Sequence, residues 1–403
     1  MAPYESDDAV GAAQDEHPRS GRRKAARYAV PVAVVGVAAA TIGLVPALAD
    51  SGDPDLPKIS AQQLIEKIAT SDVQRLSGTV KVSTDLGLPD LGGLENGLMS
   101  GSDRGGSGDG SSADPKAKLT ELVSGTHTLR VAADGPDRQK LSLLESGAEY
   151  SLIHDGKDVW GYDSKSNEVY HATGAASGKG RDAEPPATPK DFADEALKSV
   201  DDTTSVTVDG TAHVAGRDAY KLLIRPRQSG TTVGAISIAV DAKTGMPLKF
   251  TLTPRSGGAA VLDAGFTQVS FARPAASTFD FTPPKGAKVT EEKDAAGARE
   301  HAPEHGGDLA GGLEGKDGLK VLGKGWTSVA TFDTGAKGGV PTGSQGGELG
   351  GFLGSLGDPV SGKFGKGTVF STRLVNALIT DDGKVYAGTV TKEALVKAAD
   401  AGK

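Results

Sequence analysis

The feature that most constrains this chain is a two-residue alternation of apolar and polar side chains, which repeats in three successive runs between residues 219 and 252. Turns rich in Gly, Asp and Ser separate the runs at 228–230 and 241–247. Alternation of this kind predicts antiparallel strands with one apolar and one polar face. We expect the apolar face to curve around an apolar ligand such as an acyl chain. The apolar positions are Tyr220, Leu222, Ile224, Ile236, Ile238, Val240, Leu248, Phe250 and Leu252.

Similar short runs occur before and after this stretch. Asp-Gly turns at 134–137 and 154–157 join neighbouring runs, as in hairpins. Short strands at regular spacing predict one continuous antiparallel sheet. The further strands are expected at 78–85, 126–132, 139–144, 150–153, 158–162, 167–172, 206–214 and 261–271.

Two amphipathic helices are predicted beside these strands. The first covers 60–73 and begins with a capping box formed by Ser60 and Gln63. The second covers 189–200, after the cap Thr188. Because the second helix is inserted between runs of strands, its apolar stripe needs a surface to cover. We expect it to lie as a lid on the concave apolar face of the sheet.

Candidate ligand-binding residues are the apolar side chains expected to line the space between the sheet and the lid helix. An acyl chain of about 15 methylenes would gain roughly 12 kcal/mol there before the cost of immobilisation. The alternative is that the same side chains fill a packed core between sheet and helix. The candidates are Leu129, Val131, Leu141, Leu143, Tyr150, Leu152, Trp160, Tyr162, Phe192, Leu197, Tyr220, Leu222, Ile224, Ile236, Ile238, Leu248, Phe250 and Leu252.

The N-terminus is predicted to target the chain to the membrane. Residues 1–27 form a disordered cytoplasmic region that ends in a cluster of Arg and Lys. Residues 28–49 carry no charge and would span about 33 Å as a helix. Cations before the span and acids after it place the remaining chain outside the cytoplasm. Residues 28–49 are either a transmembrane anchor in the cell membrane or a signal peptide cleaved near Ala49, which would leave a secreted protein.

Composition divides the rest of the chain into units. Residues 58–290 hold the predicted strands and helices, interrupted by a Gly- and Ser-rich insertion at 86–115 that we expect to be disordered. Residues 291–316 are charged, rich in Gly and Ala, and predicted to be a linker. Residues 317–403 are predicted to form a small α+β domain, with strands at 326–332, 368–379 and 385–390 and a closing helix at 391–399.

No catalytic, metal or cofactor site is predicted. The chain has no cysteine, and its net charge of −8 argues against nucleic-acid binding. His301, Glu304 and His305 match a zinc-peptidase pattern, but Pro303 would break the helix that this mechanism needs. A hydrolase acting on surface polymers remains the enzymatic alternative.

Several stretches resemble the LolA/LppX superfamily, and especially its MucB/RseB-like branch. The resemblance covers about residues 58–290, and residues 378–386 are weakly similar to the small C-terminal domain of that branch. It implies a curved antiparallel half-barrel of α+β class with a helical lid, which holds lipid or lipoprotein acyl chains. The stretches are 60–83, 126–131, 149–162, 167–170, 215–222, 240–249 and 279–286.

The function predicted from pattern and resemblance together is non-enzymatic lipid or lipoprotein binding outside the cytoplasm. The alternative that the resemblance implies is an envelope-stress regulator that binds a membrane anti-sigma factor. The predicted partners are therefore an acyl chain, the cytoplasmic membrane and a membrane protein.

Overall fold

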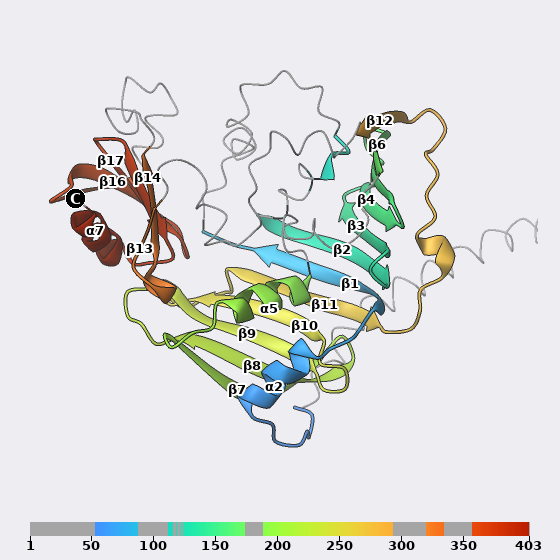
Figure 1. Cartoon of the computed structure of the whole chain (residues 1–403), viewed down its shortest axis with the longest axis horizontal. Coiled ribbons are helices and arrows are strands. Elements are labelled where there is room, and N and C mark those ends of the chain that lie inside the picture. Colours follow the sequence, from blue (N-terminus) through green and yellow to red (C-terminus); the bar gives the residue numbers. More distant parts are fainter. Residues whose placement is uncertain are drawn as a thin grey trace, which may run out of the picture. The chain divides into compact units, whose positions relative to one another are not determined.

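The computed structural model describes residues 53–87, 112–115, 118, 122, 124–173, 188–292, 320–333 and 357–402. The predicted segments 1–27 and 28–49, and most of the insertion 86–115 and of the linker 291–316, lie outside these residues. Within them the chain forms two β-sheets, and the larger sheet has 12 strands (Figure 1).

The larger sheet is antiparallel except at one edge, where β12 pairs parallel with β6. Its order is β12-β6-β5-β4-β3-β2-β1-β11-β10-β9-β8-β7, so β7 and β12 are its edges and the sheet is not closed. This arrangement agrees with the predicted half-barrel, although β12 extends the sheet into the segment predicted as linker. The strands are β1 Arg75–Thr84, β2 Gly125–Asp134, β3 Arg138–Glu145, β4 Ala148–Asp155, β5 Asp158–Asp163, β6 Glu168–Thr173, β7 Thr204–Val214, β8 Arg217–Pro226, β9 Val233–Asp241, β10 Pro247–Pro254, β11 Leu262–Ser270 and β12 Lys288–Glu292.

Strand register aligns the apolar positions into one face that crosses most of the sheet. Leu129 on β2 lies opposite Val80 on β1 and Leu143 on β3. On the other side, Val82 lies opposite Ala264 on β11, which in turn lies opposite Phe250 on β10. Because residues i and i+2 of a strand share a face, Val80 and Val82 join both sets into one surface.

Two helices pack on this face (Figure 1). Helix α2, Ala61–Ala69, begins with the predicted capping box, in which the Ser60 Oγ accepts from the Gln63 N at 3.2 Å. Helix α5, Pro189–Lys198, begins with a second capping box formed by Thr188 and Asp191. Both helices end earlier than their apolar patterns predict, at Ala69 and Lys198.

The smaller sheet has the order β13-β14-β18-β17-β16-β15 and packs against the C-terminal helix α7. The predicted strand 368–379 is two strands, because the chain turns between Ser371 and Asn376. The elements are β13 Lys320–Leu322, β14 Val329–Asp333, β15 Gly357–Gly362, β16 Gly365–Ser371, β17 Asn376–Thr380, β18 Lys384–Gly388 and α7 Lys392–Ala401.

Candidate functional site

One part of the apolar face, on β8–β10, is covered by α2 and α5, and we call it the helix-covered half. Leu222, Ile224 and Ile238 are each 0% exposed and pack in one cluster with apolar side chains of both helices. Phe192 of α5 stacks on Phe250 of β10, with ring centroids 5.4 Å apart. Burying a large aliphatic side chain contributes about 1.5–3 kcal/mol, so these contacts help to hold both helices on the sheet.

The other part of the apolar face, on β2–β6, is covered by a different element, and we call it the strap-covered half. The strap consists of the described residues 112–115, Lys118 and Leu122. Residues 112–115 are the end of the insertion 86–115 that was predicted to be disordered, and in the structure they pack against the sheet. Ala113 is 0% exposed and Leu122 is 8% exposed. Both belong to the cluster that contains Leu129, Leu143 and Tyr150.

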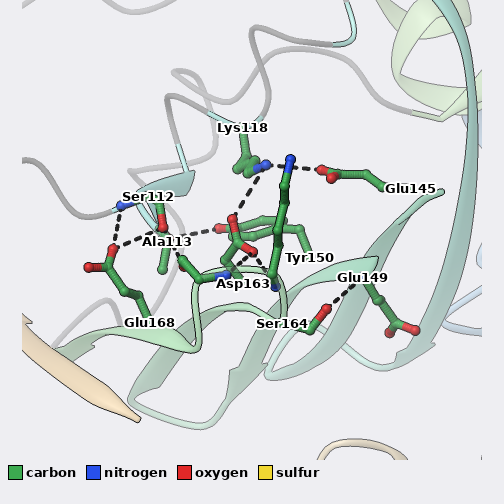
Figure 2. Close-up of polar contacts among 11 residues, drawn as sticks. Ser112, Ala113, Lys118, Glu145, Glu149, Tyr150, Asp163, Ser164 and Glu168 are labelled. Atoms are coloured by element: carbon green, nitrogen blue, oxygen red, sulfur yellow. Dashed lines mark hydrogen bonds and ion pairs between the residues drawn. The ribbon is translucent and has the colours of Figure 1, made fainter. Parts of the chain in front are cut away.

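Polar contacts hold the strap at its first residues (Figure 2). The Tyr150 hydroxyl donates to the Ala113 carbonyl at 3.1 Å. The backbone N and the Oγ of Ser112 donate to the Glu168 Oε2 at 2.8 and 2.9 Å. The Ser112 and Ser166 hydroxyls are 2.6 Å apart.

An ion pair holds the strap further along. The Lys118 Nζ lies 2.9 Å from the Glu145 Oε1 and 3.5 Å from the Asp163 Oδ2. The Asp163 side chain is 6% exposed, and its Oδ1 accepts from the backbone N of Lys165 at 2.8 Å. Lys118 thus places its cation between two carboxylates on the inner side of the sheet (Figure 2).

The structure places most of the predicted ligand-binding residues on the apolar face. Phe192 and Leu197 of α5 lie against the helix-covered half, and Leu248 is fully buried in the cluster that contains Val80 and Leu129. Their role in ligand binding stays a prediction. The residues that register puts on this face are Leu129, Val131, Leu141, Leu143, Tyr150, Leu152, Tyr220, Leu222, Ile224, Ile236, Ile238, Phe250 and Leu252.

Trp160 and Tyr162 lie on the opposite face. Register pairs Leu152 with Gly161, so the two aromatic residues on either side of Gly161 point away from the apolar face. Both rings contact Phe281, at centroid distances of 5.5 and 5.7 Å. They therefore do not share a surface with the other candidates.

Trp160 also supports an ionic cluster on this opposite face. His171 stacks on Trp160 at a centroid distance of 3.7 Å. Its Nδ1 lies 2.7 Å from the Glu291 Oε2 and its Nε2 3.0 Å from the Asp158 Oδ1. Burial alone would lower the pKa of His171, but the two carboxylates outweigh burial and raise the pKa above its ordinary value. The cluster ties β12 to β6.

A hollow of about 480 Å³ is present on the polar face. Its walls are the side of β1–β3 that carries Thr79, Arg130, Lys140 and Ser142, together with Gln268 of β11. Register puts these residues on the face opposite Val80 and Leu129. On the apolar face, side chains of both helices and of the described strap residues pack against residues predicted to bind a ligand.

Metal ligands and membrane spans were sought in the part of the chain that the structure describes. No group of three or more His, Asp or Glu side chains suited to a metal ion is present among those residues. No helix among them is long and apolar enough to cross a membrane. The span predicted at 28–49 and the His-rich motif at 301–305 fall outside the described ranges.

Comparison with known proteins gives matches among solved structures alone. No family model matches the chain, and no curated protein does. A structure of the MucA/MucB complex of Pseudomonas aeruginosa aligns over 84% of this chain and 96% of its own, at 16% identity and a TM-score of 0.39. A LolA superfamily protein from Nitrosomonas europaea aligns over 56% of this chain and 99% of its own, at 10% identity and a TM-score of 0.22.

A third match is an uncharacterized conserved protein from Thermus thermophilus. It aligns over 58% of this chain and 99% of its own, at 12% identity and a TM-score of 0.31. The matches thus include both groups that the sequence resembles. Since every one of these TM-scores is below 0.5, the proposals below rest on residues of this chain.

Proposed function

We propose that the chain is a non-enzymatic protein that binds an acyl chain of a lipid or lipoprotein outside the cytoplasm. The observation that carries this proposal is the apolar face, which is continuous from Tyr150 on β4 to Ile224 on β8. In a β-sandwich, a second sheet would cover such a face. Here two short helices and the strap cover it, and none of them is a strand of the sheet.

Helix α5 serves as the lid in this proposal. It has 10 residues, and its apolar contacts include the Phe192–Phe250 stack and the buried Ala193 and Ala196. Small residues on the contact side let the helix lie close to the sheet. An acyl chain beneath it would replace these contacts with similar apolar contacts, so exchange would cost little net free energy.

The predicted N-terminal segment sets where this binding takes place. As an anchor, residues 28–49 would hold residues 58–290 beside the outer leaflet, where lipids and lipoproteins are available. Residues 317–403 would then form a second unit outside the membrane. Cleavage near Ala49 would instead release the same units as a secreted carrier.

Native mass spectrometry of the purified full chain tests the proposal. We expect co-purified lipid in the wild type and its loss in Leu252→Asp, because Leu252 lies on the apolar face and is partly exposed, which lets the variant fold. The matched control is Lys81→Asp, on the opposite face of β1. Circular dichroism verifies that both variants are folded.

The outcomes separate the two functions that the sequence predicts. Lipid retained equally by wild type, Leu252→Asp and Lys81→Asp would refute binding at the apolar face. A membrane protein that co-purifies in place of lipid would support the second function, binding to a membrane anti-sigma factor.

A further inference from the structure

We propose that the strap competes with the acyl chain for the apolar face. The strap must leave the sheet before a ligand can lie along β2–β5. This inference rests on the proposed function and adds a regulatory element to it. The strap occupies the same wall that the ligand would use, since Ala113 and Leu122 share a cluster with Leu129, Leu143 and Tyr150. Ligand and strap therefore exclude each other.

The sheet is shaped to receive the strap. Gly161 lies on the inner side of β5, opposite Leu152. A Cβ added at Gly161 would come within 2.5 Å of the Ala113 carbonyl oxygen and 2.9 Å of the Tyr150 hydroxyl. Real Cβ atoms do not approach this closely, so the absence of a side chain at 161 makes room for the strap backbone.

Several contacts that hold the described strap residues are polar ones that water can replace. Ser112 bonds to Glu168, and Lys118 pairs with Glu145 and Asp163. Of the described strap residues, Ala113 and Leu122 bury apolar side chains in the cluster. Polar groups that leave the sheet regain hydrogen bonds to water, so release costs far less than removing an apolar helix. Lys118 acts as the latch because its cation joins the strap to two carboxylates of the sheet.

A reversible lock tests the inference directly. The Ser112 and Ser166 hydroxyl oxygens are 2.6 Å apart, so Ser112→Cys with Ser166→Cys brings two thiols within bonding reach. The natural chain has no cysteine, so the two introduced thiols can pair with no others within the chain. Binding of a fluorescent C16 fatty acid to this full-length double variant is measured after oxidation and again after reduction.

We expect the oxidised form to bind at least about tenfold more weakly than the reduced form, because apparent affinity falls with the fraction of molecules whose site is open. Equal affinities in both states would overturn the strap as a competitor and leave the proposed function intact. Absence of binding in the oxidised and reduced forms and in the wild type would instead refute the proposed function, and this inference with it.

Opening variants supply the opposite measurement. Gly161→Ala pushes the Ala113 carbonyl away, Tyr150→Phe removes its hydrogen-bond donor, and Lys118→Gln removes the latch cation. Each should bind the fatty acid several-fold more tightly than wild type. The matched control is Lys165→Gln, which removes an exposed charge nearby and should leave affinity unchanged. Unchanged affinity in all three opening variants would contradict the inference.

Discussion

The helix-covered half and the strap-covered half belong to one apolar face but are covered in different ways. In the helix-covered half, apolar side chains of α2 and α5, among them Leu64 and Ile68, pack on β8–β10. In the strap-covered half, the sheet contacts a chain segment whose anchors are Ser112 and Lys118. The difference indicates that apolar packing holds one cover on the sheet, while polar contacts hold the other and let it open without unfolding.

The largest expected effect is the loss of an ion pair between β8 and β9, on the face of these strands opposite the helix-covered half. The Arg217 Nε and Nη2 donate to the Asp241 Oδ1 and Oδ2 at 2.6 and 3.1 Å, and Asp241 is 1% exposed. Arg217→Met leaves this carboxylate buried without its cation, so the free energy of unfolding should fall by about 3–5 kcal/mol. Urea denaturation at pH 7 measures the change.

The pH dependence of this effect follows from the direction of the shift. Burial would raise the pKa of Asp241, but hydrogen bonds from Arg217 and Thr244 outweigh it and lower the pKa. The stabilisation is therefore present above the unfolded-state pKa of about 3.9 and is lost as pH falls through the folded-state value. The comparison variant on the strap is Lys118→Met, which should change global stability by less than about 1 kcal/mol because the strap opens locally. Equal losses in Arg217→Met and Lys118→Met would contradict local opening of the strap.

Substitution of one leucine in each half compares the two covers through apolar contacts alone, with a smaller expected loss of unfolding free energy. Leu222→Ala empties a site that is 0% exposed beneath the helices and should cost about 2–5 kcal/mol of unfolding free energy. Leu122→Ala changes a strap residue that is 8% exposed and should cost about 1 kcal/mol. Hydrogen exchange should report global opening in the first variant and faster exchange confined to β2–β6 in the second. A global change in both would show that the strap belongs to the folding core.

Much of the sheet could be predicted because alternation, turns and caps act locally. Period two alone assigns Leu222, Ile238 and Phe250 to one face, and strand register confirms this. The capping residues Ser60 and Thr188 mark both helix starts correctly. Helix ends are less predictable, since the apolar pattern continues past Ala69 and Lys198. Val73 and Val200 still pack against the apolar clusters, but the chain that carries them is no longer helical.

The remaining features depend on contacts that sequence spacing does not encode. Trp160 and Tyr162 were assigned to the apolar face because they are the large apolar residues of β5. In the structure the apolar face of β5 carries Gly161, because the strap backbone leaves no room for a side chain there, and Trp160 and Tyr162 therefore lie on the opposite face. The strap itself follows low-complexity sequence, and its signal is weak: a few apolar residues, such as Leu122, after the last glycines. Strand β12 was hidden in the same way by the charged stretch after Glu291.

The smallest expected effect concerns β12, the edge strand that polar contacts hold as they hold the strap. His171 connects β6 to Glu291 of β12, and its pKa is raised by Glu291 and Asp158 against the effect of burial. A raised pKa means that the stabilisation is complete below the unfolded-state value of about 6.5 and is lost as pH rises through the folded-state value. Amide exchange of residues 288–292 should therefore become less protected between mildly acidic and alkaline pH in the wild type, after correction for the intrinsic rate. His171→Gln should show low protection with no such pH step. A pH step that persists in His171→Gln would assign the titration to another group. Loss of the pH step in His171→Gln would show that β12, like the strap, is attached to the sheet by ionic contacts. Such contacts can be released by a change in pH or by a ligand.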